Sequence, residues 1–270
     1  MEEISNNDLK QIQIDILQHV NDFCHKYNIV YSLAYGTLIG AVRHKGYIPW
    51  DDDIDIVMTR SEYNKFLMLY KNKDTSKYKI YNYKTCSSCT IPYTKVFDDE
   101  TLWLEDVENK VEIGVNIDVF PLDKIPIKDK RHLKILKKIR KLKQILMLKQ
   151  VSISSHRNPL KNAILILGHF MLKKVSIYKI VKKIDTIGLT FSEESLDNYS
   201  NVVWTPYGIG DYVTEKDIGN IVRLPFENTI FDAYEGYDRW LRGVYNDYLQ
   251  LPPKEKQITH HAFKAYWKHH

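Results

Sequence analysis

Three aspartates at alternate positions stand out as side chains that could bind a metal ion. Asp51, Asp53 and Asp55 are each separated by one residue, and Ile54 and Ile56 alternate with them. If this segment is a strand, the carboxylates project from one face and the isoleucines enter the core. Carboxylates this close repel one another and raise each other's pKa, and a divalent cation removes that cost. Because the ligand atoms are all oxygen, the pattern predicts Mg²⁺ or Mn²⁺ rather than zinc.

A second group of residues could bind phosphate. Gly36 and Thr37 lie where an expected strand, 31–35, gives way to an expected short helix, 37–43. A helix N-terminus offers N–H groups and positive potential to a phosphate, and a glycine there lets the backbone approach the ligand. The Thr37 hydroxyl can add a hydrogen bond, and Arg43 can neutralise phosphate oxygens.

Another aspartate, Asp118, lies in an apolar segment, 115–120, that is expected to be a strand. A carboxylate in a buried strand is costly unless a partner such as a metal balances it. We therefore predict that Asp118 joins Asp53 and Asp55 in one site.

The elements that must position these residues follow from the hydrophobic periodicity. Strands and helices alternate at first and further strands follow, which predicts an α/β (α+β) core with a mixed sheet flanked by helices. The expected elements are an opening helix capped by Asn6, Asn7 or Asp8, strands over 31–35, 53–57, 78–83, 92–97 and 111–120, and a helix with Ser61 as its N-cap.

The net charge of +5 hides a strong division along the chain. Residues 128–183 contain 17 Lys and Arg and one acid, a balance of +16, whereas the rest carries 22 basic and 33 acidic side chains, a balance of −11. Apolar residues recur every three or four positions from 133 to 146, which predicts an amphipathic basic helix, followed by two more helices. A charge asymmetry of this size points to an anionic partner. The expected parts are a catalytic core over 1–125, a basic helical segment over 126–190, and a C-terminal part over 191–270 that completes the core.

The composition excludes several classes of protein. The chain has 270 residues, of which 44% are hydrophobic and 12% aromatic, which suits one large domain and argues against disorder. It shows no secretory signal, and its longest nearly unbroken apolar stretch, 163–172, is too short to span a bilayer. Three cysteines cannot form a disulfide framework and fit a reducing compartment. We therefore expect a cytoplasmic protein.

The segment 36–56 resembles the LicD family, a branch of the nucleotidyltransferase superfamily that also includes the fukutin-related proteins. Its sequence, GTLIGAVRHKGYIPWDDDIDI, is specific to LicD-type proteins. Gly36 and Thr37 match the turn of the superfamily, residues 53–55 match its acid–apolar–acid strand, and Asp118 matches its third acid. Further matching blocks lie at 117–123 and within 224–253.

The resemblance implies a nucleotidyltransferase-like fold and a metal-dependent phosphotransferase. Such an enzyme would move a phospho-alcohol, with phosphocholine as our first expectation, from a CDP-activated donor to a sugar hydroxyl. The acceptor would be a cell-surface glycan precursor such as teichoic acid, lipopolysaccharide or capsule. Phosphoryl transfer asks mainly for positioning and charge neutralisation, which suits the residues described above.

The resemblance also suggests roles for single residues. Asp53 and Asp55, with Asp51 beside them, would hold one or two Mg²⁺ ions, and Asp118 would complete the metal site or accept the proton of the attacking hydroxyl. Gly36, Thr37 and Arg43 would hold phosphate oxygens. The predicted substrate-binding residues also include Trp50, which could wall the pocket or pack in the core, and Lys95, which could offset the charge of the leaving group. The role of Cys86 and Cys89, which have the spacing of zinc ligands, stays open.

Acceptors of bacterial family members are often carried on membrane lipids. We therefore expect the basic segment to bind an anionic membrane at the inner face of the cytoplasmic membrane, and we expect no nucleic-acid partner. Two other functions stay open. One is transfer of a nucleoside monophosphate to a small molecule, and the other is a non-catalytic glycan- or choline-binding module with Trp204, Tyr207 and Trp240 as an aromatic cage.

Overall fold

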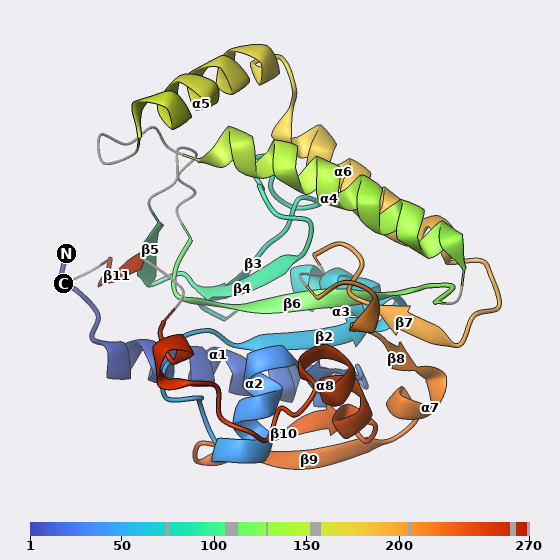
Figure 1. Ribbon diagram of the computed structural model, residues 1–270. Coiled ribbons are helices and arrows are strands. Elements are labelled where there is room, and N and C mark those ends of the chain that lie inside the picture. Colours follow the sequence, from blue (N-terminus) through green and yellow to red (C-terminus); the bar gives the residue numbers. More distant parts are fainter. Residues whose placement is uncertain are drawn as a thin grey trace.

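A mixed sheet of seven strands forms the centre of the molecule (Figure 1). The computed structural model describes residues 1–73, 76–105, 113–127, 129–151, 158–204, 207–259 and 263–268. The sheet order is β1 (Ser32–Leu33), β2 (Asp55–Thr59), β6 (Asn116–Lys124), β4 (Thr94–Asp98) and β3 (Tyr78–Tyr81), with β7 (Asn198–Ser200) on β6 and β8 (Val213–Thr214) on β7. Strands β2 and β6 are parallel, and the other neighbouring pairs are antiparallel. This arrangement, with helices on both sides in Figure 1, confirms the predicted mixed α/β class.

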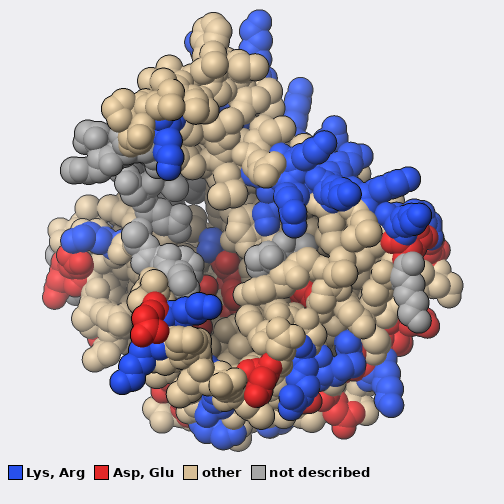
Figure 2. Space-filling model, viewed as in Figure 1, with Lys and Arg blue, Asp and Glu red and all other residues tan. Residues whose placement is uncertain are grey.

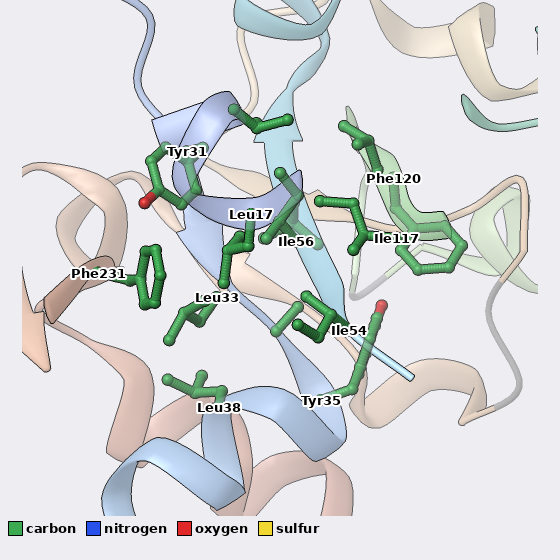
Figure 3. Close-up of a cluster of buried hydrophobic side chains, with 14 of the residues drawn as sticks. Leu17, Tyr31, Leu33, Tyr35, Leu38, Ile54, Ile56, Ile117, Phe120 and Phe231 are labelled. Atoms are coloured by element: carbon green, nitrogen blue, oxygen red, sulfur yellow. The ribbon is translucent and has the colours of Figure 1, made fainter. Parts of the chain in front are cut away.

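The main apolar core lies between the sheet and the N-terminal helices. Helix α1 (Asn6–Lys26) packs against β6 and β4, and α3 (Arg60–Lys73) packs against β2 and β6. Ile54 and Ile56 are fully buried, as the alternating pattern predicts. Figure 3 shows these two side chains in the same buried cluster as Leu17 and Ile117. Because β2 and β6 are covered on both faces, their central residues are nearly all apolar.

Several predicted boundaries near the N-terminus need correction. The N-cap of α1 is Ser5, whose hydroxyl accepts a hydrogen bond from the Asp8 amide, so Asn6, Asn7 and Asp8 belong to the first turn. The strand expected over 31–35 is shorter, because α2 (Tyr35–Ile39) begins at Tyr35 and continues as a π-helical turn (Gly40–His44). Gly36 therefore lies inside a helical turn rather than at a strand end.

The remaining predicted strands are shifted by a few residues. Strand β2 begins at Asp55 rather than 53, and β4 begins at Thr94 rather than 92. The expected strand over 111–120 lies partly outside the described residues, and β6 begins at Asn116.

The hydrophobic periodicity of the sequence did not predict two short sheets. Strand β5 (Thr101–Glu105) pairs with β11 (Phe263–Trp267), whose residues lie far away in the sequence. The hairpin of β9 (Ile221–Phe226) and β10 (Thr229–Tyr234) contacts β1. The other elements of the C-terminal part are α7 (Glu215–Ile218), α8 (Tyr237–Tyr245), and the 3-10 turns Leu189–Phe191, Gly208–Gly210 and Lys254–Lys256.

Three helices form the basic segment, as the sequence predicts. They are α4 (Lys130–Gln150), α5 (Pro159–Leu172) and α6 (Ile177–Gly188), with Asp129, Asn158 and Ser176 as N-caps. Helices α4 and α6 form a second apolar cluster together with strand β3 and the segment after β7. This cluster joins residues from all three predicted parts, so the division at 126 and 190 stays a prediction. Among the described residues, none of the helices combines the length and apolar character needed to cross a membrane.

Candidate active site

A cavity of about 380 Å³ lies where the helical segment faces the sheet. Figure 2 shows a hollow at this place, with acidic side chains inside it and a basic one beside them. Part of the cavity lining is polar, namely Gln13, Asp53, Asp55, Lys95, Asn116 and Asp118. Another part is aromatic, namely Tyr35, Tyr93, Trp103, Phe120, Trp204 and Tyr207.

The register of three neighbouring strands brings charged side chains together. Asp55 of β2 lies directly opposite Asp118 of β6, and Asp118 lies opposite Lys95 of β4. The Lys95 ammonium donates hydrogen bonds to Asp118 Oδ1 at 2.6 Å and to Asn116 Oδ1 at 2.8 Å. The structure therefore brings four of the predicted residues, Asp53, Asp55, Asp118 and Lys95, to one cavity.

Asp51 and Asp53 precede strand β2 instead of forming its first half. The expectation that Asp51, Asp53 and Asp55 share one face of a strand is therefore wrong, because β2 begins only at Asp55. The turn places carboxylate oxygens of Asp51, Asp52 and Asp53 within 4.8 Å of one another. Asp52, which the alternating pattern omits, is part of this group.

Gly36 allows Asp51 to approach the backbone of α2. A Cβ atom at position 36 would lie 2.5 Å from Asp51 Oδ2, which is closer than such atoms can come. The Gly36–Thr37 pair therefore positions the acidic turn. The hydroxyl of Thr37, which is 2% exposed, accepts a hydrogen bond from the Asp55 amide at 2.8 Å.

Burial and mutual repulsion dominate the electrostatics of this cluster. Burial raises the pKa of Asp51 to about 8, and the charge of Asp53 adds to the effect. Burial also raises the pKa of Asp55 well above its ordinary value, and the charges of Asp53, Asp118 and Asp51 raise it further. The Lys95 charge acts in the opposite direction. The oxygen-only set and its excess negative charge fit a divalent cation such as Mg²⁺.

Four predicted phosphate-binding or stacking residues lie outside the cavity lining. The Arg43 guanidinium donates hydrogen bonds to the carbonyls of Tyr248, at 2.7 Å, and Gln250, at 3.3 Å, and thus holds the segment after α8. Trp50 packs edge-on against His44. Gly36, Thr37, Arg43 and Trp50 are not among the described residues that line the cavity, and their binding roles stay predictions.

The aromatic lining is the part of the site that the sequence reasoning largely missed. Trp204 and Tyr207 line the cavity, but Trp240 is buried and donates its indole N–H to Asp211 at 2.9 Å, so the predicted three-residue cage is wrong. Tyr93 and Phe120 could have been found, because each lies two residues from a predicted site residue on or beside the same strand.

Comparisons with known proteins agree with this geometry. Residues 28–134, which contain the acidic turn, Lys95 and Asp118, match the family described as LicD/FKTN/FKRP, nucleotidyltransferase domain. The chain is 32% identical to the lipopolysaccharide cholinephosphotransferase LicD of Haemophilus influenzae over 279 aligned residues, which cover 98% of this chain and 99% of that protein. An uncharacterized protein of Rickettsia typhi is 34% identical over 74 residues, which cover 27% of this chain and 24% of that protein. An uncharacterized protein of Rickettsia prowazekii is 49% identical over 41 residues, 15% of each chain. The similarity to the Haemophilus protein extends over nearly the whole of both chains, which confirms the resemblance seen in the sequence: the chain belongs to the LicD family.

Proposed function

We propose that this chain is a transferase that moves phosphocholine from CDP-choline to a sugar hydroxyl of lipopolysaccharide, with Mg²⁺ as its cofactor. The observation that carries the proposal is the cavity in which Asp53, Asp55, Asp118 and Lys95 lie beside a set of aromatic rings. The full-length similarity to a lipopolysaccharide cholinephosphotransferase supports the choice of phosphocholine and of this acceptor.

The acidic residues supply the cation site of the proposed reaction. Asp53 and Asp55 would hold Mg²⁺, with Asp51 and Asp118 as further oxygen donors. When bound, the cation neutralises charge on the donor diphosphate. The buried position of Asp55 makes this balance important, because carboxylates without a cation would repel the anionic donor.

The remaining residues act on the donor and the acceptor. In the proposed reaction the sugar oxygen forms a bond to the choline-bearing phosphorus, and the bond from that phosphorus to the bridging oxygen breaks and releases CMP. The proton of the sugar hydroxyl passes to a carboxylate of the cluster, for which Asp118 is our choice. Lys95 holds Asp118 in place through its 2.6 Å hydrogen bond and brings a positive charge to the leaving group.

The decisive experiment is the release of CMP from different donors. The purified chain is incubated with Mg²⁺, a choline-free lipopolysaccharide and one of CDP-choline, CDP-ribitol or CDP-glycerol. We expect CMP release with CDP-choline and phosphocholine on the polysaccharide. Asp55→Asn is the inactive control. CMP release only from CDP-ribitol or CDP-glycerol would contradict the choline assignment, and nucleotide attached to the acceptor would show nucleotidylyl transfer instead. Teichoic acid and capsule precursors in place of lipopolysaccharide test the acceptor.

We also propose that the helical segment binds an anionic membrane surface, where a lipid-linked acceptor would be found. Helix α5 has no buried residue, and large apolar side chains on it are more than half exposed, namely Leu160, Ile164, Ile166, Leu167, Phe170 and Met171. Exposed lysines are Lys161 on α5 and Lys134, Lys137, Lys138 and Lys141 on α4. Figure 2 shows Lys and Arg gathered over α4 and a mostly uncharged surface over α5. An apolar face beside a basic one is the arrangement that binds an anionic bilayer.

Sedimentation with vesicles tests this membrane contact. We expect binding to vesicles with phosphatidylglycerol and weaker binding to phosphatidylcholine alone. Ile164→Glu with Phe170→Glu should remove binding, and reversing the charges of Lys134, Lys137, Lys138 and Lys141 should weaken it, by about 1 kcal/mol per favourably placed lysine. Unchanged binding of both variants at low salt would contradict the proposal. So would a stable dimer that the α5 variant converts to monomers, because α5 would then be an interface between two copies.

A further inference from the structure

A continuous wall of five aromatic rings lines the cavity beside the acidic residues. Trp204 lies 5.2 Å from Tyr93, and Tyr93 lies 4.5 Å from Phe120, measured between ring centroids. Phe120 lies 6.0 Å from Tyr35, and Tyr35 lies 5.4 Å from Tyr207. The rings come from the start of α2, the segment before β4, strand β6 and the segment after β7, so the fold assembles the wall from distant parts of the chain.

Contacts behind the wall fix the orientation of its two tyrosines at one end. The Tyr35 hydroxyl donates a hydrogen bond to Asp211 at 3.0 Å and accepts one from Asn201 at 3.1 Å. The Tyr207 hydroxyl accepts a hydrogen bond from the Tyr245 hydroxyl at 2.8 Å. These polar tips are bound to the protein, so the rings are held for packing rather than for hydrogen bonding to a ligand.

A lysine of the basic segment holds the other end of the wall. The Lys143 ammonium of α4 lies 4.0 Å from the centroid of the Trp204 ring and also donates a hydrogen bond to the Trp204 carbonyl. This contact holds the indole in place. Because the rings are held before a ligand arrives, little ordering is needed on binding.

The chemistry of such a wall selects one class of head group. Aromatic faces attract cations, and a quaternary ammonium has no N–H group that requires a hydrogen-bond acceptor. Polyol head groups such as ribitol or glycerol carry hydroxyls, which lose their hydrogen bonds to water against ring faces.

We propose that Tyr93, Trp204 and Tyr207, supported by Tyr35 and Phe120, form the binding site for the trimethylammonium group of the donor. This assignment rests on the proposed function, since it places the choline end of the donor beside the wall and its diphosphate beside the carboxylates. It makes the aromatic wall the element that selects choline over other alcohols.

Calorimetric binding of CDP-choline and CDP-ethanolamine tests the assignment, because the two ligands differ only in three methyl groups on nitrogen. We expect the wild-type protein to bind CDP-choline more tightly. Trp204→Leu and Tyr93→Leu should each weaken CDP-choline binding by about 10- to 30-fold and change CDP-ethanolamine binding by less than about threefold. Trp204→Phe should retain most of the affinity for CDP-choline. The matched control is Tyr178→Leu. Tyr178 lies on α6, packs against Tyr83 and is not part of the wall.

The outcomes separate this proposal from the proposed function. Equal weakening of both ligands, unchanged CDP-choline binding in the Leu variants, or a wild-type protein without preference for choline would overturn the wall as the choline site. Circular dichroism shows whether the Leu variants fold. If one does not, the assignment is tested by the preference of the wild-type protein for CDP-choline and by the CDP-choline affinity of Trp204→Phe. The proposed function fails separately, if the wild-type protein binds CDP-choline selectively and yet releases no CMP with any acceptor.

Discussion

A cluster of acidic side chains lies near each end of strand β6. The negative charge of the two clusters is balanced in different ways. Near the end of the strand, Asp123 and Asp185 are both bound by Arg60, at 2.7 Å each. Near its start, Asp118 is bound by Lys95, and Asp51, Asp53 and Asp55 lie close by. Burial raises the pKa of Asp123, but Arg60 opposes that effect, whereas Asp53 and Asp52 raise the pKa of Asp51 further, to about 8.

The charge balance within each cluster distinguishes a structural ion pair from a binding site in this fold. The Arg60 group is complete within the chain and joins the sheet to α6. The Asp55 group keeps an excess of negative charge inside a cavity, which suits a cation and a phosphate-bearing donor. Substitutions at the first site should therefore change the free energy of unfolding, and substitutions at the second should change activity.

The largest effect is expected for Asp55→Asn. This change removes a proposed cation ligand, and we expect the rate of CMP release from CDP-choline to fall by about 10³-fold. The metal-free protein should unfold at the same temperature as the wild type or a higher one, because a buried repulsion is relieved. A steady-state assay and thermal unfolding measure both quantities. Activity within about threefold of the wild type would remove Asp55 from the proposed machinery.

The opposite outcome is expected for Arg60→Leu. The change leaves Asp123 and Asp185 buried without their cation, which should lower the free energy of unfolding by about 3–5 kcal/mol. Urea unfolding measures the loss. The control is Arg131→Leu, which breaks the half-exposed ion pairs with Asp129 and Glu194 and should change the free energy of unfolding far less. A loss for Arg60→Leu no larger than for the control would show that the pair adds little to the fold.

Mg²⁺ should act on one acidic group and not on the other. At a concentration 100 times its dissociation constant, the ion should stabilise the wild-type protein by about 2.7 kcal/mol. Arg60→Leu should keep this increment from its lower starting point, whereas Asp53→Asn with Asp55→Asn should lose it. Unfolding with and without Mg²⁺, with EDTA as reference, measures the increment. An equal increment in the double variant would place the cation elsewhere.

Much of the acidic site follows from the sequence. Asp118 is a carboxylate in an otherwise apolar strand, which marks it as a site residue, and Gly36–Thr37 precedes the acidic turn at a spacing that the family resemblance identifies. The sequence could not show that β4 inserts antiparallel beside β6, because such pairing depends on contacts between distant residues. That pairing brings Lys95 to Asp118.

The aromatic part of the site was harder to predict for the same reason. Trp204 and Tyr207 follow β7, and only the placement of β7 on the edge of β6 brings them to the cavity. Strand β11 escaped the sequence analysis because its partner β5 is about 160 positions away. The helices of the basic segment were predicted well, since the apolar spacing that defines α4 and α6 is local, whereas Ser61, predicted as an N-cap, lies inside α3.

Lys95→Met tests whether the Lys95 ammonium beside Asp118 contributes to the chemistry or to the stability of the fold. We expect CMP release to fall by about 10- to 100-fold, because Asp118 loses its positioning hydrogen bond and the leaving group loses a charge. The unfolding free energy should fall less than for Arg60→Leu, since the Lys95–Asp118 pair is more exposed than the Arg60–Asp123 pair. The control is Lys79→Met on β3, whose ammonium donates a hydrogen bond to the Ser76 carbonyl at 2.6 Å. A loss of stability as large as that of Arg60→Leu would mean that the two acidic groups do not differ in kind.

The smallest effect is expected for Thr37→Val, which separates the two roles of that residue. The change removes the hydrogen bond that the Asp55 amide donates to the buried hydroxyl, and should lower the unfolding free energy by about 1 kcal/mol. If Thr37 only positions Asp55, the KM for CDP-choline should stay near the wild-type value and kcat should fall modestly. If its hydroxyl also binds phosphate, KM should rise. Thr37→Ser keeps the hydroxyl and should restore both quantities, and a Ser variant that behaves like the Val variant would show that loss of the hydroxyl does not explain the effect.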